Sequence, residues 1–180
     1  MPSLLVFAGP NGSGKSTIAD TWDQVGIYIN ADIIKQIRGC SDLEAAQESE
    51  LLREFCLTRK RDFSFETVLS TRRNLDLLHM AKAQGYSIES VFIMTSDAEL
   101  NVLRVKSRVL SGGHPVPVEK IRSRYTKSLA NLKELIDLSD RCTVFDNTEL
   151  PEIVITKREA TIQIIPNKFW TERDLFRLIR

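Results

Sequence analysis

The stretch Ser3-Leu-Leu-Val-Phe-Ala-Gly-Pro-Asn-Gly-Ser-Gly-Lys-Ser-Thr17 decides the fold. Its first part, residues 3–8, is a continuous apolar run of the kind that forms a buried parallel strand. The pattern G-x-x-x-x-G-K-[ST] follows over residues 9–16, and a helix should begin near Lys15. A strand, a glycine-rich turn and a helix in this order present backbone N–H groups and a helix N-terminus to phosphate oxygens. The sequence therefore predicts a phosphate-binding loop (P-loop) for a nucleoside triphosphate.

The polar groups of this loop have expected tasks. Lys15 should reach the β- and γ-phosphates, and the Ser16 hydroxyl should ligate Mg²⁺. Further nucleotide contacts are expected from Gly9, Asn11, Gly12, Ser13, Gly14 and Thr17. The expected cofactors are ATP or GTP together with Mg²⁺. The pattern does not decide between the two nucleotides, nor does it say what happens to the γ-phosphate.

Length and composition narrow the class of protein. The chain has 180 residues, 42% of them hydrophobic and 27% charged, as in one globular domain with a full core. Its net charge of +1 gives no electrostatic case for nucleic acid or a membrane surface as partner. The three widely spaced cysteines suggest neither a metal site nor a disulfide framework. No stretch approaches the roughly 18 apolar residues of a membrane span. We expect a single cytoplasmic domain, residues 1–180.

Strands and helices alternate along most of the chain. After the first strand, strands are expected at residues 27–29, 62–69, 87–95 and 142–146. Ser41 and Ser96 each open an S-x-x-E capping box, and one helix should run on to about Leu138. This alternation predicts an α/β fold with an open, mainly parallel sheet flanked by helices. Residues 150–180 instead predict an antiparallel hairpin and a capped final helix.

The segment Leu110-Ser-Gly-Gly-His114 differs by one residue from the LSGGQ signature of transporter-type ATPases. In those proteins the signature leads directly into a helix. Here Pro115 and Pro117 follow at once, and proline pushes the residue before it toward extended geometry. The chain also lacks the hydrophobic strand ending in Asp-Glu that should come about twenty residues later. The segment therefore does not indicate a transporter-type ATPase.

A lid explains the same region better. Residues 103–127 hold seven basic side chains and one acidic one, namely Arg104, Lys106, Arg108, Lys120, Arg122, Arg124, Lys127 and Glu119. Arg104 and Arg108 are four residues apart and share a helix face. Two arginine-bearing helices joined by a Gly-Gly-His-Pro loop could close over the nucleotide and neutralise the transferring phosphoryl group. The alternative is an ordinary solvated basic face.

One acidic residue follows a predicted strand and another lies within one. Asp32, in YINAD, lies at the carboxyl edge of the sheet, where it could orient an acceptor hydroxyl and take its proton. Alternatively, Asn30 or Asp32 could cap the helix ADIIKQI. Glu66 lies in an apolar strand, where an ionised carboxylate is costly unless it is paired or hydrated. It should face the site, accepting substrate hydroxyls or holding a metal-bound water, or else end the strand early. Arg72 could reach a substrate phosphate or be solvated.

The order GPNGSGKST, NAD, FETVLS, RVKSRVLSGGHPVP, IRSRYTKSLANL and VFDNT resembles the zeta-toxin family of P-loop kinases over about residues 3–150. More narrowly, it resembles a short branch often called predicted ABC-type ATPases. The resemblance implies a P-loop NTPase fold of the kinase type and phosphoryl transfer from ATP or GTP to a hydroxyl. In the characterised toxins the acceptor is UDP-N-acetylglucosamine. Toxin members are held inactive by a small antitoxin that blocks the nucleotide site, so such a partner would be in keeping with the resemblance.

The resemblance also assigns roles to residues. Asp32 matches the general base and Lys15 the P-loop lysine, while Glu66, with Thr67 beside it, matches the acid that helps bind the sugar nucleotide. Arg104 or Arg108 matches the first lid arginine. The longer toxins carry a second lid arginine near a Thr-Pro, where this chain reads His114-Pro-Val-Pro117; Arg122 or Arg124 could replace it. The nucleotide contacts expected from the lid are Arg108, His114 and Arg124, and those expected for the substrate are Asp32, Glu66, Thr67 and Arg72.

The function predicted from the sequence is therefore an ATP- and Mg²⁺-dependent phosphotransferase acting on a nucleotide sugar. E-T-V-L-S stands where the longer toxins have E-G-T-L-R, which leaves the acceptor open. One alternative keeps the kinase chemistry with a nucleoside, a drug or a polynucleotide 5′ end as acceptor, the last disfavoured by the near-neutral charge. Another is a non-catalytic ATP-binding switch whose output is lid closure.

Overall fold

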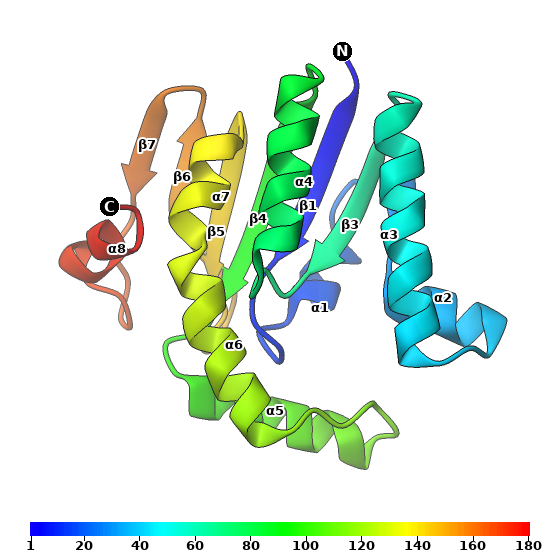
Figure 1. Cartoon of the computed structure of the whole chain (residues 1–180). Helices are drawn as coiled ribbons and strands as arrows, with labels where there is room; N and C mark the ends of the chain where they lie inside the picture. The colour runs from blue at the N-terminus through cyan, green and yellow to red at the C-terminus, as the bar shows by residue number, and fades with distance from the viewer.

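A seven-stranded β-sheet forms the centre of the protein, whose residues 1–180 are all described by a computed structural model (Figure 1). The strands are β1 (Ser3–Ala8), β2 (Ile27–Ile29), β3 (Phe63–Thr67), β4 (Ser87–Met94), β5 (Arg141–Asp146), β6 (Glu152–Arg158) and β7 (Thr161–Ile164). Their order across the sheet is β2-β3-β1-β4-β5-β6-β7. The first five strands are parallel, and the β5–β6 and β6–β7 pairings are antiparallel. The predicted open, mainly parallel sheet with a C-terminal hairpin is confirmed.

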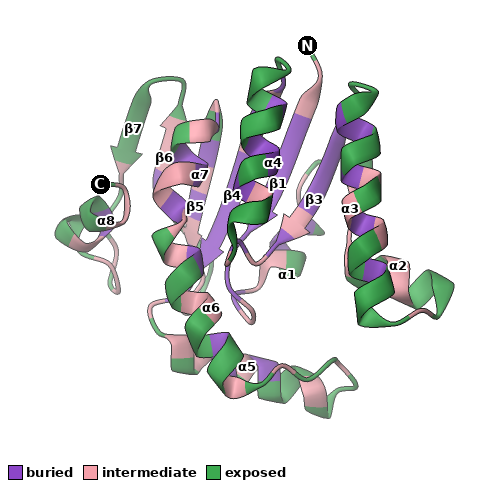
Figure 2. Cartoon of the chain, viewed as in Figure 1, coloured by how far each residue is buried: buried purple, intermediate pink, exposed green.

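Helices cover both faces of this sheet. They are α1 (Lys15–Ala19), α2 (Ala31–Arg38), α3 (Asp42–Thr58), α4 (Arg72–Ala83), α5 (Ala98–Leu110), α6 (Val118–Ala130), α7 (Leu132–Leu138) and α8 (Glu172–Leu178). In Figure 1, α3, α4 and α7 lie in front of the sheet and α1 lies behind it. Figure 2 shows that buried residues are concentrated on the strands and on the helix faces turned toward them.

The composition of β1 follows from its central position. Leu4, Val6 and Ala8 point into a core of 25 residues shared with α3, α4 and α7. Leu5 and Phe7 alternate with them and join a smaller cluster of six residues with α1. Successive side chains of a strand face opposite sides, so a strand covered on both faces must be apolar throughout. The first apolar run of the sequence is therefore the central strand of the sheet.

Two details of the helices differ from the prediction. Asp97, not Ser96, caps α5: its side chain accepts from Glu99 N at 3.0 Å. The Ser96 backbone is occupied elsewhere, because its N–H donates to Thr148 Oγ1 at 2.9 Å. The single helix expected to end near Leu138 is divided at Asn131 into α6 and α7. The Asn131 side chain donates to Leu69 O at 2.8 Å, which ties this point to the loop after β3. The capping box at Ser41 is confirmed, and the predicted cap of the final helix is provided by Thr171.

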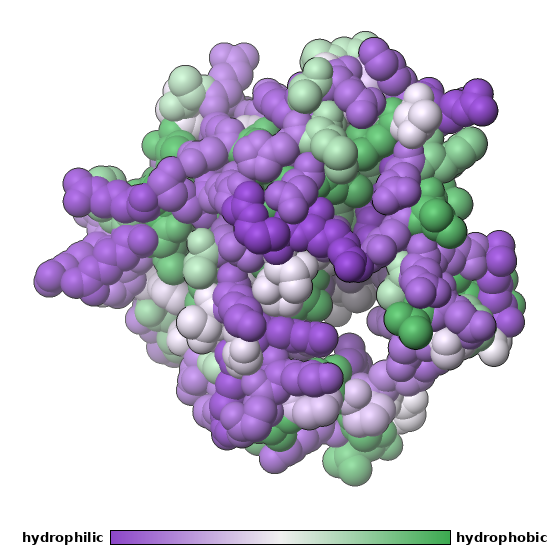
Figure 3. Space-filling model, in the orientation of Figure 1, coloured by the Kyte–Doolittle hydropathy of each residue, from purple (hydrophilic) through white to green (hydrophobic).

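The parallel strands bring their carboxyl ends to one edge of the sheet, at the bottom of Figure 1. Below this edge α5 and α6 cross the molecule, joined by the loop 111–117. Figure 3 shows a hollow between these elements and α2. None of the helices is both long and apolar enough to span a lipid bilayer.

Candidate active site

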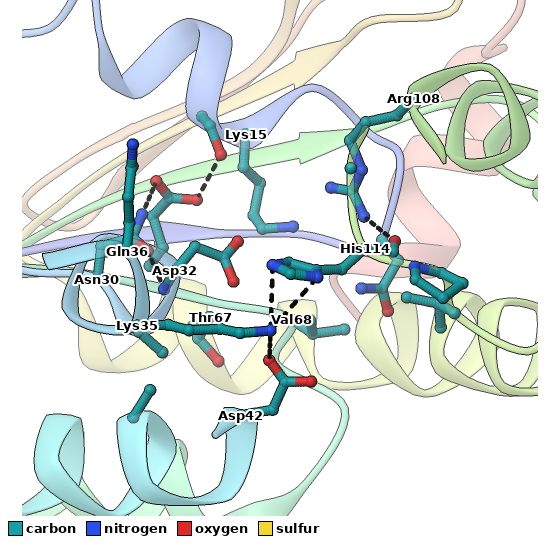
Figure 4. A pocket seen from close by; sticks show the side chains of 18 of the residues that line it. Lys15, Asn30, Asp32, Lys35, Gln36, Asp42, Thr67, Val68, Arg108 and His114 are labelled. Carbon is teal, nitrogen blue, oxygen red and sulfur yellow. Dashed lines mark hydrogen bonds and ion pairs between the residues drawn. The ribbon is translucent and has the colours of Figure 1, made fainter. Parts of the chain in front are cut away.

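A cavity of about 780 Å³ lies at this edge of the sheet, between the P-loop, α2 and the loop that joins α5 to α6 (Figure 4). These elements belong to distant parts of the sequence. Among the residues predicted for the site, those that line the cavity are Asn11, Gly12, Lys15, Ser16, Asp32, Glu66, Thr67, Arg108 and His114. Gly9, Ser13, Gly14, Thr17, Arg72, Arg104 and Arg124 do not line it.

Close packing around the P-loop requires glycine. Gly12 has a φ of 78°, and a Cβ there would lie 2.6 Å from Asn101 O. Gly14, with a φ of 93°, would meet the Asn147 side chain at 2.3 Å. Asn147 also donates to Ser13 O at 2.7 Å, so the loop after β5 supports the P-loop from behind. The VFDNT motif thus holds the phosphate-binding backbone in place.

Lys15 projects from the start of α1 into the cavity (Figure 4). Its ammonium donates to Pro10 O at 3.1 Å. Burial lowers the pKa of Lys15 to about 8, against an opposing influence of the Glu66 carboxylate. The lysine is therefore less solvated than a surface lysine and lies next to two carboxylates, those of Glu66 and Asp32. Such an ammonium interacts strongly with an incoming phosphate, because it has little water to lose.

Glu66 faces the site, which is one of the two alternatives that the sequence leaves open for it. Ser16 Oγ donates to Glu66 Oε2 at 3.0 Å. The other carboxylate oxygen, Oε1, accepts from Asn30 Nδ2 at 2.8 Å and from the Tyr28 hydroxyl. Thr67, the next residue, also lines the cavity, but its hydroxyl is engaged with Leu69 N at 2.9 Å. The cost of placing a carboxylate in this strand is thus offset by three donors.

Asp32 lies in the first turn of α2 and is not its cap. The cap is Asn30, whose Oδ1 accepts from Asp32 N at 2.8 Å and from Ile33 N at 3.4 Å. The Asp32 carboxylate makes no hydrogen bond or ion pair within the chain and points toward Lys15 in the cavity (Figure 4). It is therefore available to an acceptor hydroxyl.

Arg108 and His114 form the side of the cavity opposite α2. Arg108 Nη2 donates to His114 O at 3.3 Å. The His114 ring lies across the cavity mouth, with its nitrogens 3.3 and 3.2 Å from the Lys35 ammonium, which also pairs with Asp42 at 2.7 Å. Leu110, the first residue of the LSGG segment, is the last residue of α5. The segment thus ends a helix, whereas the transporter signature leads into one.

The other predicted arginines are engaged elsewhere. Arg104 donates to Asn147 O at 2.8 Å and to Thr148 O at 3.1 Å, so it braces the loop after β5. Arg124 Nη1 donates to the P-loop residue Asn11 at 3.3 Å, whereas Arg122 pairs with Glu99 and Glu119. Arg72 pairs with Glu134 on α7. Arg108 is therefore the arginine in the cavity, and Arg124 is the second one near the P-loop.

Three residues of the site were not predicted from the sequence as functional. Lys35 lies one helical turn beyond Asp32 on the same face of α2, a spacing that could have indicated it. The sequence indicates Asn30 only as a helix cap, although it also contacts Glu66. Tyr28 lies on the edge strand β2 and reaches Glu66 as well. The contacts of Asn30 and Tyr28 with Glu66 depend on the pairing of β2 with β3, which no local pattern reveals.

The strand order, the P-loop between β1 and α1, and the polar cavity beside it define the class of P-loop proteins with a kinase-like fold. Within that class, the chain belongs to the zeta-toxin family, whose sequence profile matches residues 1–168. An uncharacterised protein of Haemophilus influenzae is 32% identical over 127 residues, which cover 67% of this chain and 91% of that protein.

Solved structures share the fold. A chain of the AvrRxo1-ORF1:AvrRxo1-ORF2 complex with ATP has a TM-score of 0.74 and 16% identity, and the match covers 99% of this chain and 63% of that one. The same complex with sulphate ions gives a TM-score of 0.72 and 17% identity, covering 91% of this chain and 61% of that one. The chain thus spans less than two thirds of those proteins. A chain of the PezAT toxin–antitoxin system of Streptococcus pneumoniae has a TM-score of 0.61 and 18% identity, and the match covers 99% of this chain and 83% of that one.

Proposed function

We propose that the protein transfers the γ-phosphoryl group of ATP to a hydroxyl of a nucleotide sugar, with UDP-N-acetylglucosamine as the acceptor. The observation that carries this proposal is the meeting of three groups in one cavity: a P-loop lysine, an unpaired carboxylate and an arginine. They are Lys15, Asp32 and Arg108. Family membership supports the same chemistry, and the choice of acceptor rests on the resemblance of the motifs to those of the characterised toxins.

In this mechanism the P-loop amides and Lys15 hold the β- and γ-phosphates. Asp32 accepts a hydrogen bond from the acceptor hydroxyl and takes its proton as the oxygen attacks the γ-phosphorus. The bond between the γ-phosphorus and the β–γ bridging oxygen breaks, and ADP leaves. Arg108, with Arg124 behind it, offsets the negative charge on the transferring group.

Ser16 and Glu66 fit Mg²⁺, because a hydroxyl and a carboxylate oxygen 3.0 Å apart are hard oxygen ligands. Mg²⁺, when bound, would neutralise phosphate charge.

We also propose that residues 103–127 act as a lid. The two helices α5 and α6 pack on each other through a small cluster of Val102, Val105 and Ile121. Their connecting loop contacts α2 through His114, whose ring nitrogens lie beside the Lys35 ammonium. A unit with its own core and a polar contact across the cavity mouth can open without breaking the main core.

Mass spectrometry of UDP-N-acetylglucosamine incubated with the protein, ATP and Mg²⁺ tests the function. We expect a product heavier by one phosphoryl group. Asp32→Asn should lower the rate by about 100-fold or more, because the amide cannot take the proton, while the Kd for ATP stays within about threefold. Asp76→Asn, on the exposed face of α4, is the matched control. No phosphorylated product, or a normal rate in Asp32→Asn, would refute the proposal.

A protein partner belongs to the same proposal. The PezAT structure concerns a toxin–antitoxin system, and the AvrRxo1 structures are complexes of two proteins. We propose that an antitoxin controls this chain too, and that the chain works in the cytoplasm, in keeping with its three free cysteines. Induced expression of the chain alone should arrest growth, and Asp32→Asn should relieve the arrest. Equal growth arrest by both forms would contradict the link to catalysis.

A further inference from the structure

We propose that Asn30 is a positioning residue that fixes the proposed base Asp32 and the acid Glu66 in one geometry. The catalytic part of this inference rests on the proposed function, and the positioning part rests on the hydrogen bonds of Asn30. The amide oxygen accepts from Asp32 N at 2.8 Å and so starts α2. The amide nitrogen donates to Glu66 Oε1 at 2.8 Å. One side chain therefore connects α2 to the end of β3.

The second of these bonds is not needed for capping. A cap requires only an acceptor, and aspartate or serine caps a helix as well as asparagine does. The asparagine amide offers an acceptor oxygen to the α2 backbone and, at the same time, a separate donor nitrogen to the neighbouring strand. The register Ile29↔Phe65 between β2 and β3 sets Asn30 beside Glu66. The position thus demands more than a helix cap.

The contact determines which way the Glu66 carboxylate faces. Asn30 and the Tyr28 hydroxyl both donate to Oε1. Burial and the bond to Glu66 raise the pKa of Tyr28, so this hydroxyl remains a donor throughout the physiological range. With Oε1 held by two donors, Oε2 is left for Ser16 at 3.0 Å. Asn30 therefore holds the carboxylate that contacts the P-loop serine, and it also caps the helix that carries Asp32, two residues along the chain.

Asn30→Asp separates the two tasks. It keeps the acceptor for the α2 backbone but replaces the donor with a second carboxylate against Glu66. Two carboxylates at this distance repel each other, so the Glu66 side chain should turn away from residue 30 and no longer present Oε2 to Ser16.

The experiment compares kcat and the Kd for ATP of Asn30→Asp with those of the unsubstituted protein at one pH. We expect kcat to fall by about tenfold or more and the Kd to change by less than about threefold, because misplaced groups slow the transfer step more than they weaken nucleotide binding. Tyr28→Phe removes one donor and leaves Asn30 in place, so its kcat should fall by less than that of Asn30→Asp. The thermal midpoint of each variant confirms that the protein is folded.

A second readout does not depend on catalysis. The ¹³C signal of the Glu66 carboxyl, assigned with Glu66→Gln, should change its position at a fixed pH in Asn30→Asp, because the carboxylate loses the Asn30 donor. A kcat of folded Asn30→Asp within about threefold of that of the unsubstituted protein, or an unchanged Glu66 signal, would overturn the inference. If the unsubstituted protein phosphorylates no acceptor, the proposed function fails by itself, and the carboxyl signal still decides whether Asn30 holds Glu66.

Discussion

At the scale of single residues, Lys15 gives the cavity a pH dependence. Burial lowers its pKa to about 8 in the empty protein. Nucleotide phosphates favour the charged ammonium and must raise this pKa on binding. Affinity for ATP should therefore be nearly constant between about pH 7 and 8 and should fall by up to about tenfold per unit above pH 8. Calorimetric titration at several pH values measures this, with proton uptake expected near pH 8.

Lys15→Arg provides the control for that measurement. A guanidinium stays charged in proteins, so the variant should bind ATP with an affinity that no longer changes between about pH 7 and 9. Its absolute affinity should be lower, because the planar group does not fit the space of an ammonium. The same slope in both proteins would show that another group titrates.

The residues of the site divide into those that the sequence predicts and those that need the fold. The P-loop pattern places Lys15 and Ser16 directly. The carboxylate of Glu66 could be expected to face the site, because an unpaired charge in an apolar strand is too costly to bury. The choice between Arg104 and Arg108 could not be made, since both lie on one helix face. Only the loop after β5, whose carbonyls Arg104 contacts, separates them.

At the scale of elements, the loop between α5 and α6 depends on Gly113. A Cβ at this position would lie 2.7 Å from Arg108 Cγ and 2.9 Å from Arg108 O. Gly113→Ala should therefore displace Arg108 and lower kcat by about tenfold or more, as small misplacements of charged groups do. Gly112→Ala is the matched control: its φ of 90° brings strain of about 1–2 kcal/mol, but no atom lies within 4 Å of the new Cβ.

Steady-state kinetics of both alanine variants, together with Arg108→Ala, tests this. Gly113→Ala combined with Arg108→Ala should be little worse than Arg108→Ala alone, because both changes remove the same interaction. Equal rates for Gly112→Ala and Gly113→Ala would contradict a specific contact of Gly113 with Arg108.

The boundaries of elements are predictable where local chemistry decides them. Ser41 and Thr171 begin helices because each side chain and its partner three residues later satisfy one another. The same pattern fails at Ser96, whose N–H donates to the loop after β5, and the helix cap falls to Asp97. The break at Asn131 likewise depends on a contact with Leu69 O, 62 residues away. Contacts between distant segments override local capping preferences in both cases.

At the scale of the whole molecule, the C-terminal hairpin and α8 share the core of the kinase-like sheet. Leu175, the one buried residue of α8, belongs to the same 25-residue cluster as Val154 of β6 and Val144 of β5. We therefore expect the chain to unfold as one domain. Leu175→Ala should lower the free energy of unfolding by about 2–5 kcal/mol, because it empties a fully buried site. Phe176→Ala, at a side chain that is 42% exposed, should cost less than about 1 kcal/mol.

Urea unfolding followed by two probes distinguishes a chain that unfolds as one domain from a domain with a loosely attached C-terminal tail. Far-ultraviolet circular dichroism reports on all helices, and Trp170, which packs against the main cluster, reports on the C-terminal segment. In a Trp22→Phe background the two signals should coincide, and Leu175→Ala should shift both midpoints together. An earlier transition of the Trp170 signal alone, with the dichroism midpoint unmoved, would mean that residues 150–180 fold as a separate unit. The parallel sheet would then be stable without β6, although β6 covers one edge of β5 along its whole length.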